Sequence, residues 1–131
     1  MYMLDTNTCI YVLKERSQRL RHRFKATPAL CISAVTYAEL CVGIGNSAAS
    51  LRDARWGQLA AFTRLLLIEP LEEEAARHYG RLRARLRRQG LPIGNNDLFI
   101  AAHALSLGAV LVTNNEREFR RIPDLTVENG R

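Results

Sequence analysis

Three acidic residues stand where their carboxylates could meet in the folded chain. Asp5 follows an apolar run at residues 1–4, Glu39 lies in an apolar helical stretch, and Asp97 precedes another such stretch. In a parallel sheet, the segments that follow the strands meet at one edge. Three neighbouring carboxylates repel one another unless a cation neutralises them. Such a group suits a hard divalent ion, Mg²⁺ or Mn²⁺, which takes oxygen ligands and retains waters.

The chemistry that these acids could perform is metal-assisted hydrolysis. A bound ion would lower the pKa of a water and stabilise charge on a phosphodiester under attack. Each acid also has a structural interpretation. Asp5 and Asp97 could cap helices, and Glu39 follows Thr36 by three residues, which is the capping-box spacing. Ser33 is the better helix cap, however, and it places Glu39 inside the helix.

The acids need a framework, and short apolar runs supply it. Strands are expected at 2–5, 30–32, 66–68 and 109–113, with an edge strand at 125–127, and helical stretches separate them. Continuous apolar runs are typical of parallel strands that are buried on both faces. We therefore expect an α/β fold, a three-layer sandwich with a mostly parallel central sheet and helices on both faces. It should form a single domain over residues 1–131.

Local signals predict where helices begin and which side chains they bury. Asn7 or Thr8 is expected to begin the first helix. In the helix near 51–65, Trp56 and Phe62 are expected to face the core. Neither a Gly-x-Gly-x-x-Gly motif nor a phosphate-binding loop occurs, which argues against a dinucleotide-binding protein or a P-loop nucleotidase.

The charge balance favours a polyanionic partner. Lysine and arginine total 19 against 13 acids, a formal net charge of +6. Such a chain is attracted to nucleic acid. Arginines at one face of a long helix (Arg81, Arg85, Arg88) and on an early basic helix (Arg19, Arg23) could follow a phosphate backbone. The alternative is that they are solvated helix faces.

Cysteine usage and hydropathy indicate a cytoplasmic protein. The three cysteines are odd in number and lack CxxC spacing, which argues for a reducing compartment. The apolar stretches are shorter than the roughly 20 residues of a membrane span. Zinc is not expected, because the three histidines are far apart and have no cysteine at ligand spacing.

Ordered sequence blocks along nearly the whole chain carry a family resemblance. They are MLDTN at 3–7, ISAVTYAEL at 32–40, GLPIGNND at 90–97, IAAHA at 100–104, LVTNN at 111–115 and EF at 118–119. With these blocks the chain resembles the PIN-domain ribonucleases, and within them the VapC-type toxins of bacterial toxin–antitoxin pairs. The resemblance implies a PIN-like fold and Mg²⁺-dependent cleavage of RNA, with Mn²⁺ as an alternative ion.

The resemblance also implies roles for particular residues. Asp5, Glu39 and Asp97 would be the catalytic acids. Asp5 and Asp97 would bind the metal directly, and Glu39 would bind it directly or through water. Thr6 and Thr113 would be supporting hydroxyl contacts to the acids.

A fourth acid stands in many relatives just after the residue that matches Thr113. Here Asn115 takes that place, with Asn114 as the alternative. An amide oxygen can bind a metal or its water but brings no charge. Glu116 or Glu118 would substitute only if the turn brings one of them inward. His103 is interpreted as a helix residue packed near the site.

The partners implied by the resemblance are an RNA substrate, transfer RNA among the candidates, and a VapB-type antitoxin. A homodimer is also implied. The asparagine at position 115 leaves a second interpretation open, a non-catalytic PIN-like RNA- or protein-binding module. That module would bind RNA without Mg²⁺ and yield no cleavage products.

Overall fold

A parallel sheet forms the centre of the molecule. The computed structural model describes residues 1–15 and 18–130. Within them the strands are β1 (Tyr2–Leu4), β2 (Leu30–Ser33), β3 (Leu67–Glu69), β4 (Val110–Thr113) and β5 (Val127–Asn129). Their spatial order is β3-β2-β1-β4-β5, and every neighbouring pair is parallel. The expected α/β fold is confirmed.

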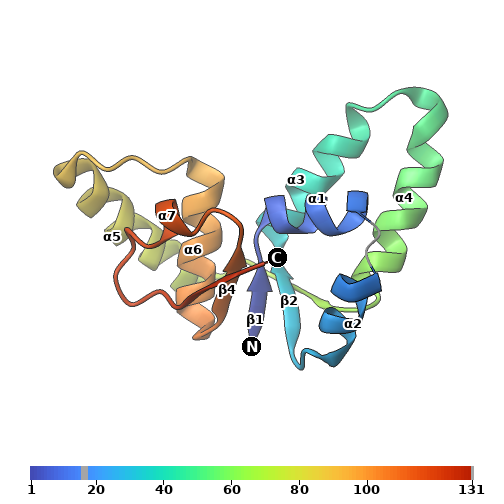
Figure 1. Cartoon of the computed structure of the whole chain (residues 1–131). Helices are drawn as coiled ribbons and strands as arrows, with labels where there is room; N and C mark the ends of the chain where they lie inside the picture. Colours follow the sequence, from blue (N-terminus) through green and yellow to red (C-terminus); the bar gives the residue numbers. More distant parts are fainter. Residues whose placement is uncertain (16–17, 131) are drawn as a thin grey trace.

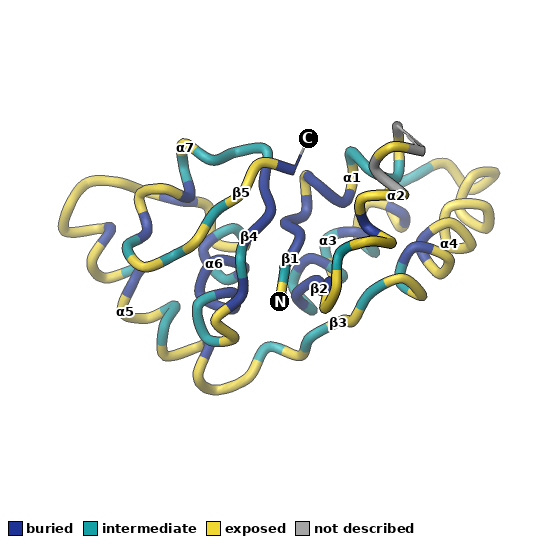
Figure 2. Tube along the Cα trace, turned by 60° about the horizontal axis from the view of Figure 1, so that its bottom comes forward, coloured by how far each residue is buried: buried dark blue, intermediate teal, exposed yellow. Residues whose placement is uncertain are grey.

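Helices cover both faces of this sheet (Figure 1). They are α1 (Thr6–Glu15), α2 (Gln18–Ala26), α3 (Ala34–Gly45), α4 (Ala49–Thr63), α5 (Glu73–Gln89), α6 (Asn95–Leu107) and α7 (Glu116–Phe119). Alternate strand residues point to opposite faces, which divides the core in two. Met3, Cys31 and Leu111 join a cluster with α5, α6 and α7, whereas Leu4, Ile32 and Val112 join a cluster with α1 to α4. Figure 2 shows this burial along β1, β2, β4 and α6, whereas β3 and β5 at the two edges of the sheet are largely exposed.

The register of the strands brings three polar residues to one edge. Leu4 pairs with Ile32 on one side and with Val112 on the other. The residue after each therefore lies at the carboxyl edge of the sheet, and these residues are Asp5, Ser33 and Thr113. All three are buried. Open α/β sheets bind ligands at this edge.

Some local predictions are wrong. Helix α1 begins at Thr6, so Asn7 and Thr8 lie inside its first turn. The last strand starts at Val127, two residues later than expected. Its predicted position at the edge of the sheet is confirmed. In α4, Phe62 is buried but Trp56 is 42% exposed. No helix in the part of the chain that is described has the length and apolarity of a membrane span.

Candidate active site

Asp5 combines a structural role with a place in the site. Its Oδ1 accepts the Thr8 backbone N–H at 2.8 Å, so Asp5 caps α1. Its Oδ2 accepts a short hydrogen bond from the Thr113 hydroxyl. The residue is only 2% exposed. Both carboxylate oxygens are therefore held in place by donors from two different elements.

Glu39 enters the site from the second turn of α3. Ser33 caps this helix as predicted, because its Oγ accepts the Val35 N–H at 3.1 Å. Glu39 is half-buried. The Thr6 hydroxyl donates to Glu39 Oε1 at 2.7 Å, and its oxygen lies 3.2 Å from Oγ1 of Thr36. Thr6 thus links the start of α1 to the acid on α3.

Asp97 lies in the first turn of α6 and is half-buried. Burial, and after it repulsion from Glu118, Asp5 and Glu39, together raise the pKa of Asp97 to about 6 from its ordinary 3.8. Carboxylates couple in this way only when they share one neighbourhood. The structure therefore brings together the three acids that the sequence predicts, and it adds Glu118.

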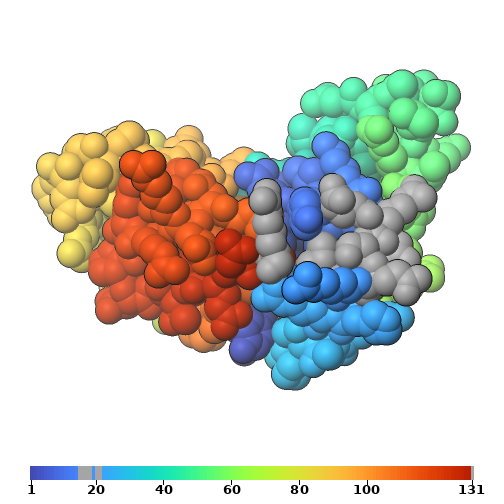
Figure 3. Space-filling model, in the orientation of Figure 1, coloured from blue at the N-terminus to red at the C-terminus, as the bar shows by residue number. Residues whose placement is uncertain are grey.

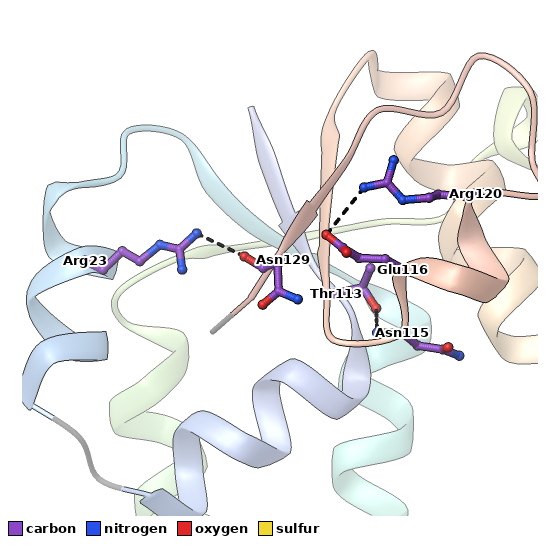
Figure 4. Close-up of polar contacts among 6 residues, drawn as sticks. All are labelled: Arg23, Thr113, Asn115, Glu116, Arg120 and Asn129. Atoms are coloured by element: carbon purple, nitrogen blue, oxygen red, sulfur yellow. Dashed lines mark hydrogen bonds and ion pairs between the residues drawn. The ribbon is translucent and has the colours of Figure 1, made fainter.

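Glu118 is held toward the site by its own turn. The Asn115 side-chain N–H donates to Glu118 Oε2 at 2.6 Å, and the Asn115 backbone N–H donates to Thr113 Oγ1 at 2.9 Å. Glu116 instead forms an ion pair with Arg120, N to O 3.6 Å (Figure 4). Of the two substitute acids considered, Glu118 is the one that the turn brings inward. Asn115 contacts this acid through its side-chain N–H, and its own place beside the metal stays a prediction.

These four acids, Asp5, Glu39, Asp97 and Glu118, are called the acidic cluster. The ion pairs found among the described residues, Arg77–Glu73 and Arg120–Glu116, both lie outside the four. Within residues 1–15 and 18–130, no three Asp, Glu, His or Cys side chains are close enough to ligate one ion by themselves. Mg²⁺ binds through one or two carboxylates and keeps several waters, so this donor set fits it.

The remaining predicted residues fall in two groups. Thr6 and Thr113 contact the acidic cluster directly. His103 is buried in α6 and contacts Ser33, outside the cluster. The five predicted RNA-binding arginines do not form one continuous surface. Arg81, Arg85 and Arg88 lie on α5, and Arg19 and Arg23 lie on α2, at the other end of the molecule (Figures 1 and 3).

Comparisons with known proteins agree with this geometry. A family model described as "PIN domain" matches residues 2–125. The tRNA(fMet)-specific endonuclease VapC of Salmonella typhimurium is 43% identical over 129 residues, 98% of this chain and 96% of the relative. Ribonuclease VapC1 of Haemophilus influenzae is 44% identical over 128 residues, 95% of this chain and 94% of the relative.

A solved structure agrees over the same length. The DNA-bound VapBC of Salmonella typhimurium contains a chain with a TM-score of 0.93 and 41% identity, covering 99% of this chain and 98% of that one. Fold, site and sequence thus define a PIN-domain nuclease. The chain belongs to the PIN-domain family and, within it, to the VapC ribonucleases.

Proposed function

We propose that the protein is a Mg²⁺-dependent endoribonuclease toxin, acting as a single PIN domain over residues 1–131. The observation that carries the proposal is the coupling of Asp97 to three other carboxylates at the carboxyl edge of the sheet. Membership of the VapC ribonucleases supports the same activity. Mn²⁺ should replace Mg²⁺, because it favours the same oxygen ligands.

The four acids of the acidic cluster would play different parts in binding the metal ion. Asp5 and Asp97 would hold the ion directly, and Glu39 would hold it directly or through water. Once bound, the ion supplies an activated water and stabilises charge on the phosphodiester. Thr6 donates to Glu39 Oε1, which leaves Oε2 as an acceptor for a water. Glu118 adds the fourth negative charge.

The proposed substrate is transfer RNA, and initiator tRNA in particular. The Salmonella typhimurium relative is named a tRNA(fMet)-specific endonuclease. The arginines of α5 (Arg81, Arg85, Arg88) and of α2 (Arg19, Arg23) would contact phosphates, and all five are exposed. Because α2 and α5 lie far apart, they would bind two separate stretches of backbone.

Cleavage of purified tRNAs tests this proposal. Incubation with Mg²⁺ should cut initiator tRNA at one position and leave elongator tRNAs intact, as read from the 5′ ends of the products. Equal cutting of all tRNAs would contradict the substrate assignment. RNA that is bound without Mg²⁺ and never cut would instead favour the non-catalytic binding module.

The proposed protein partners are a VapB-type antitoxin and a second copy of the chain. The solved VapBC structure of a relative at 41% identity supports the antitoxin. Co-expression with a cognate VapB-type antitoxin should relieve growth arrest, and a continued arrest would contradict the pairing. Sedimentation should give twice the monomer mass, whereas a single monomer mass would rule out the dimer.

Glu118→Gln is expected to lower cleavage by about tenfold, because the variant removes one charge from the acidic cluster while keeping a similar shape. The matched control is Glu116→Gln, since Glu116 lies two residues away on the same helix and pairs with Arg120. Initial rates at several Mg²⁺ concentrations measure the effect. Equal rates for the two variants would exclude Glu118 from the site.

The double variant Arg81→Gln and Arg85→Gln is expected to raise KM for RNA about tenfold and leave kcat unchanged. The slope of log affinity against log salt should fall by about 1 to 2, as phosphate contacts are lost. Arg77→Gln is the control, because Arg77 lies on the same helix but pairs with Glu73. An unchanged salt slope would contradict phosphate contact by α5.

A further inference from the structure

A buried hydrogen bond joins two elements that carry different acids. His103 in α6 is 1% exposed, and its Nδ1 lies 2.8 Å from Oγ of Ser33, 70 positions earlier in the chain. Ser33 ends β2 and caps α3. Neither residue belongs to the acidic cluster. Among the side-chain hydrogen bonds found in the described residues, this one links α6 to the β2–α3 junction.

The protons of this pair can be assigned from what each atom already binds. Ser33 Oγ accepts the Val35 N–H, so its own hydrogen is free to donate to His103 Nδ1. Burial lowers the pKa of His103, which favours the neutral ring, and the ring also hydrogen-bonds the backbone of Pro70. With the Ser33 hydroxyl donating to Nδ1, the ring proton lies on Nε2. In this hydrogen bond the Ser33 hydroxyl is therefore the donor and His103 Nδ1 is the acceptor.

The bond lies where a small change in the angle between α3 and α6 would move the carboxylates of Glu39 and Asp97. Asp97 lies six residues before His103 on α6 (103 − 97 = 6), and Glu39 lies six residues after Ser33 (39 − 33 = 6). Each interval is about 9 Å of helix. Helix α3 starts at the carboxyl edge of the sheet, and α6 runs back past that edge toward the start of β4 (Figure 1). A tilt of about 5° at the junction would move either carboxylate by roughly 0.8 Å over that length.

Apolar packing fixes this angle less sharply than a hydrogen bond does. Val35 of α3 packs against the core cluster that holds the buried apolar residues of α6, whereas Leu40 and Ile44 of α3 belong to the other cluster. Apolar packing is non-directional, whereas a buried hydrogen bond has a preferred length and angle. Misplacement by about 1 Å at an active site can cost about 100-fold in rate.

We propose that His103 is a positioning residue, whose hydrogen bond with Ser33 sets the separation of Asp97 and Glu39 in the acidic cluster. This inference rests on the proposed metal-dependent nuclease function. The alternative is that His103 only fills space in the core. The two differ in what they predict for metal affinity in a protein that is still folded.

Mn²⁺ binding, followed by electron paramagnetic resonance, is the test, because it needs no RNA cleavage. His103→Leu keeps an apolar core but removes the acceptor, and it should weaken Mn²⁺ binding about tenfold and lower kcat by a similar factor. His103→Asn offers an acceptor at the same branch point and should recover binding to within about threefold. Ser106→Ala, which removes a hydrogen bond within α6 alone, should match the wild type.

A second variant covers the case in which His103→Leu does not fold. Ser33→Gly removes the hydroxyl while keeping a residue that caps helices well, and it should give the same tenfold loss as His103→Leu. In the double variant the losses should not multiply in full, because both changes remove the shared bond between Ser33 and His103. Each change also removes one bond of its own, to the Val35 N–H for Ser33 and to the Pro70 backbone for His103. Wild-type Mn²⁺ affinity in the folded single variants, or fully multiplied losses, would overturn the inference. Absence of RNA cleavage by the wild type would instead overturn the proposed function.

Discussion

Asp97→Asn is expected to abolish RNA cleavage while making the metal-free protein more stable. The variant removes a proposed metal ligand, and a loss of at least about 100-fold in rate follows from removing one such electrostatic group. It also removes a half-buried charge that three carboxylates repel. Activity and stability should therefore change in opposite directions, which an ordinary damaging substitution does not produce.

The sign of the stability change follows from the pKa of Asp97. That pKa is about 6 in the folded protein against an ordinary 3.8, so the folded state binds the proton more tightly than the unfolded state. The penalty is absent below pH 4, grows between pH 4 and 6, and is complete above pH 6. The full shift would be roughly 3 kcal/mol, which we reduce to about 1 kcal/mol because Asp97 is partly exposed to solvent.

Thermal unfolding in EDTA measures this effect. At pH 7 Asp97→Asn should melt about 3 °C above the wild type, and near pH 4 the two should coincide. Added Mg²⁺ should stabilise only the wild type, since binding to the folded state raises its stability. A melting temperature at pH 7 that is equal to or below that of the wild type would contradict the coupling of the four acids.

Asp5→Asn is expected to reduce cleavage by at least about 100-fold and, unlike Asp97→Asn, to destabilise the fold. An asparagine Oδ1 can still accept the Thr8 N–H, but its Nδ2 cannot accept the Thr113 hydroxyl. Loss of this buried, charge-assisted bond should cost about 2 kcal/mol, which exceeds the gain from relieving the repulsion between Asp5 and Asp97.

Denaturant unfolding and single-turnover cleavage measure these two effects. Asp53→Asn on α4 is the control, because Asp53 is exposed and lies outside the acidic cluster. It should behave as the wild type in both assays. Full cleavage by folded Asp5→Asn would remove Asp5 from the site.

Much of the fold follows from short-range patterns. Buried apolar runs predict the strands, because a strand covered on both faces needs apolar residues at every position. The serine at position 33 predicts the start of α3. The convergence of Asp5, Glu39 and Asp97 then follows from parallel pairing, since each acid comes near the carboxyl edge.

Other features depend on contacts that the local sequence does not encode. The apolar pattern of α4 cannot tell which of its apolar residues will be covered, and Trp56 lies outside the core. Glu118 enters the site through a bond to Asn115 across a turn. The two arginine groups are separated because α2 and α5 lie over opposite faces of the sheet. Long-range packing determines which face each helix covers.

The central claim is that the acidic cluster binds a divalent metal and cuts RNA with it. The most direct measurement is cleavage of initiator tRNA by the purified protein in EDTA, and again after Mg²⁺ is restored. We expect no cleavage in EDTA and recovery of the full rate with excess Mg²⁺. Cleavage that continues undiminished in EDTA would contradict the claim.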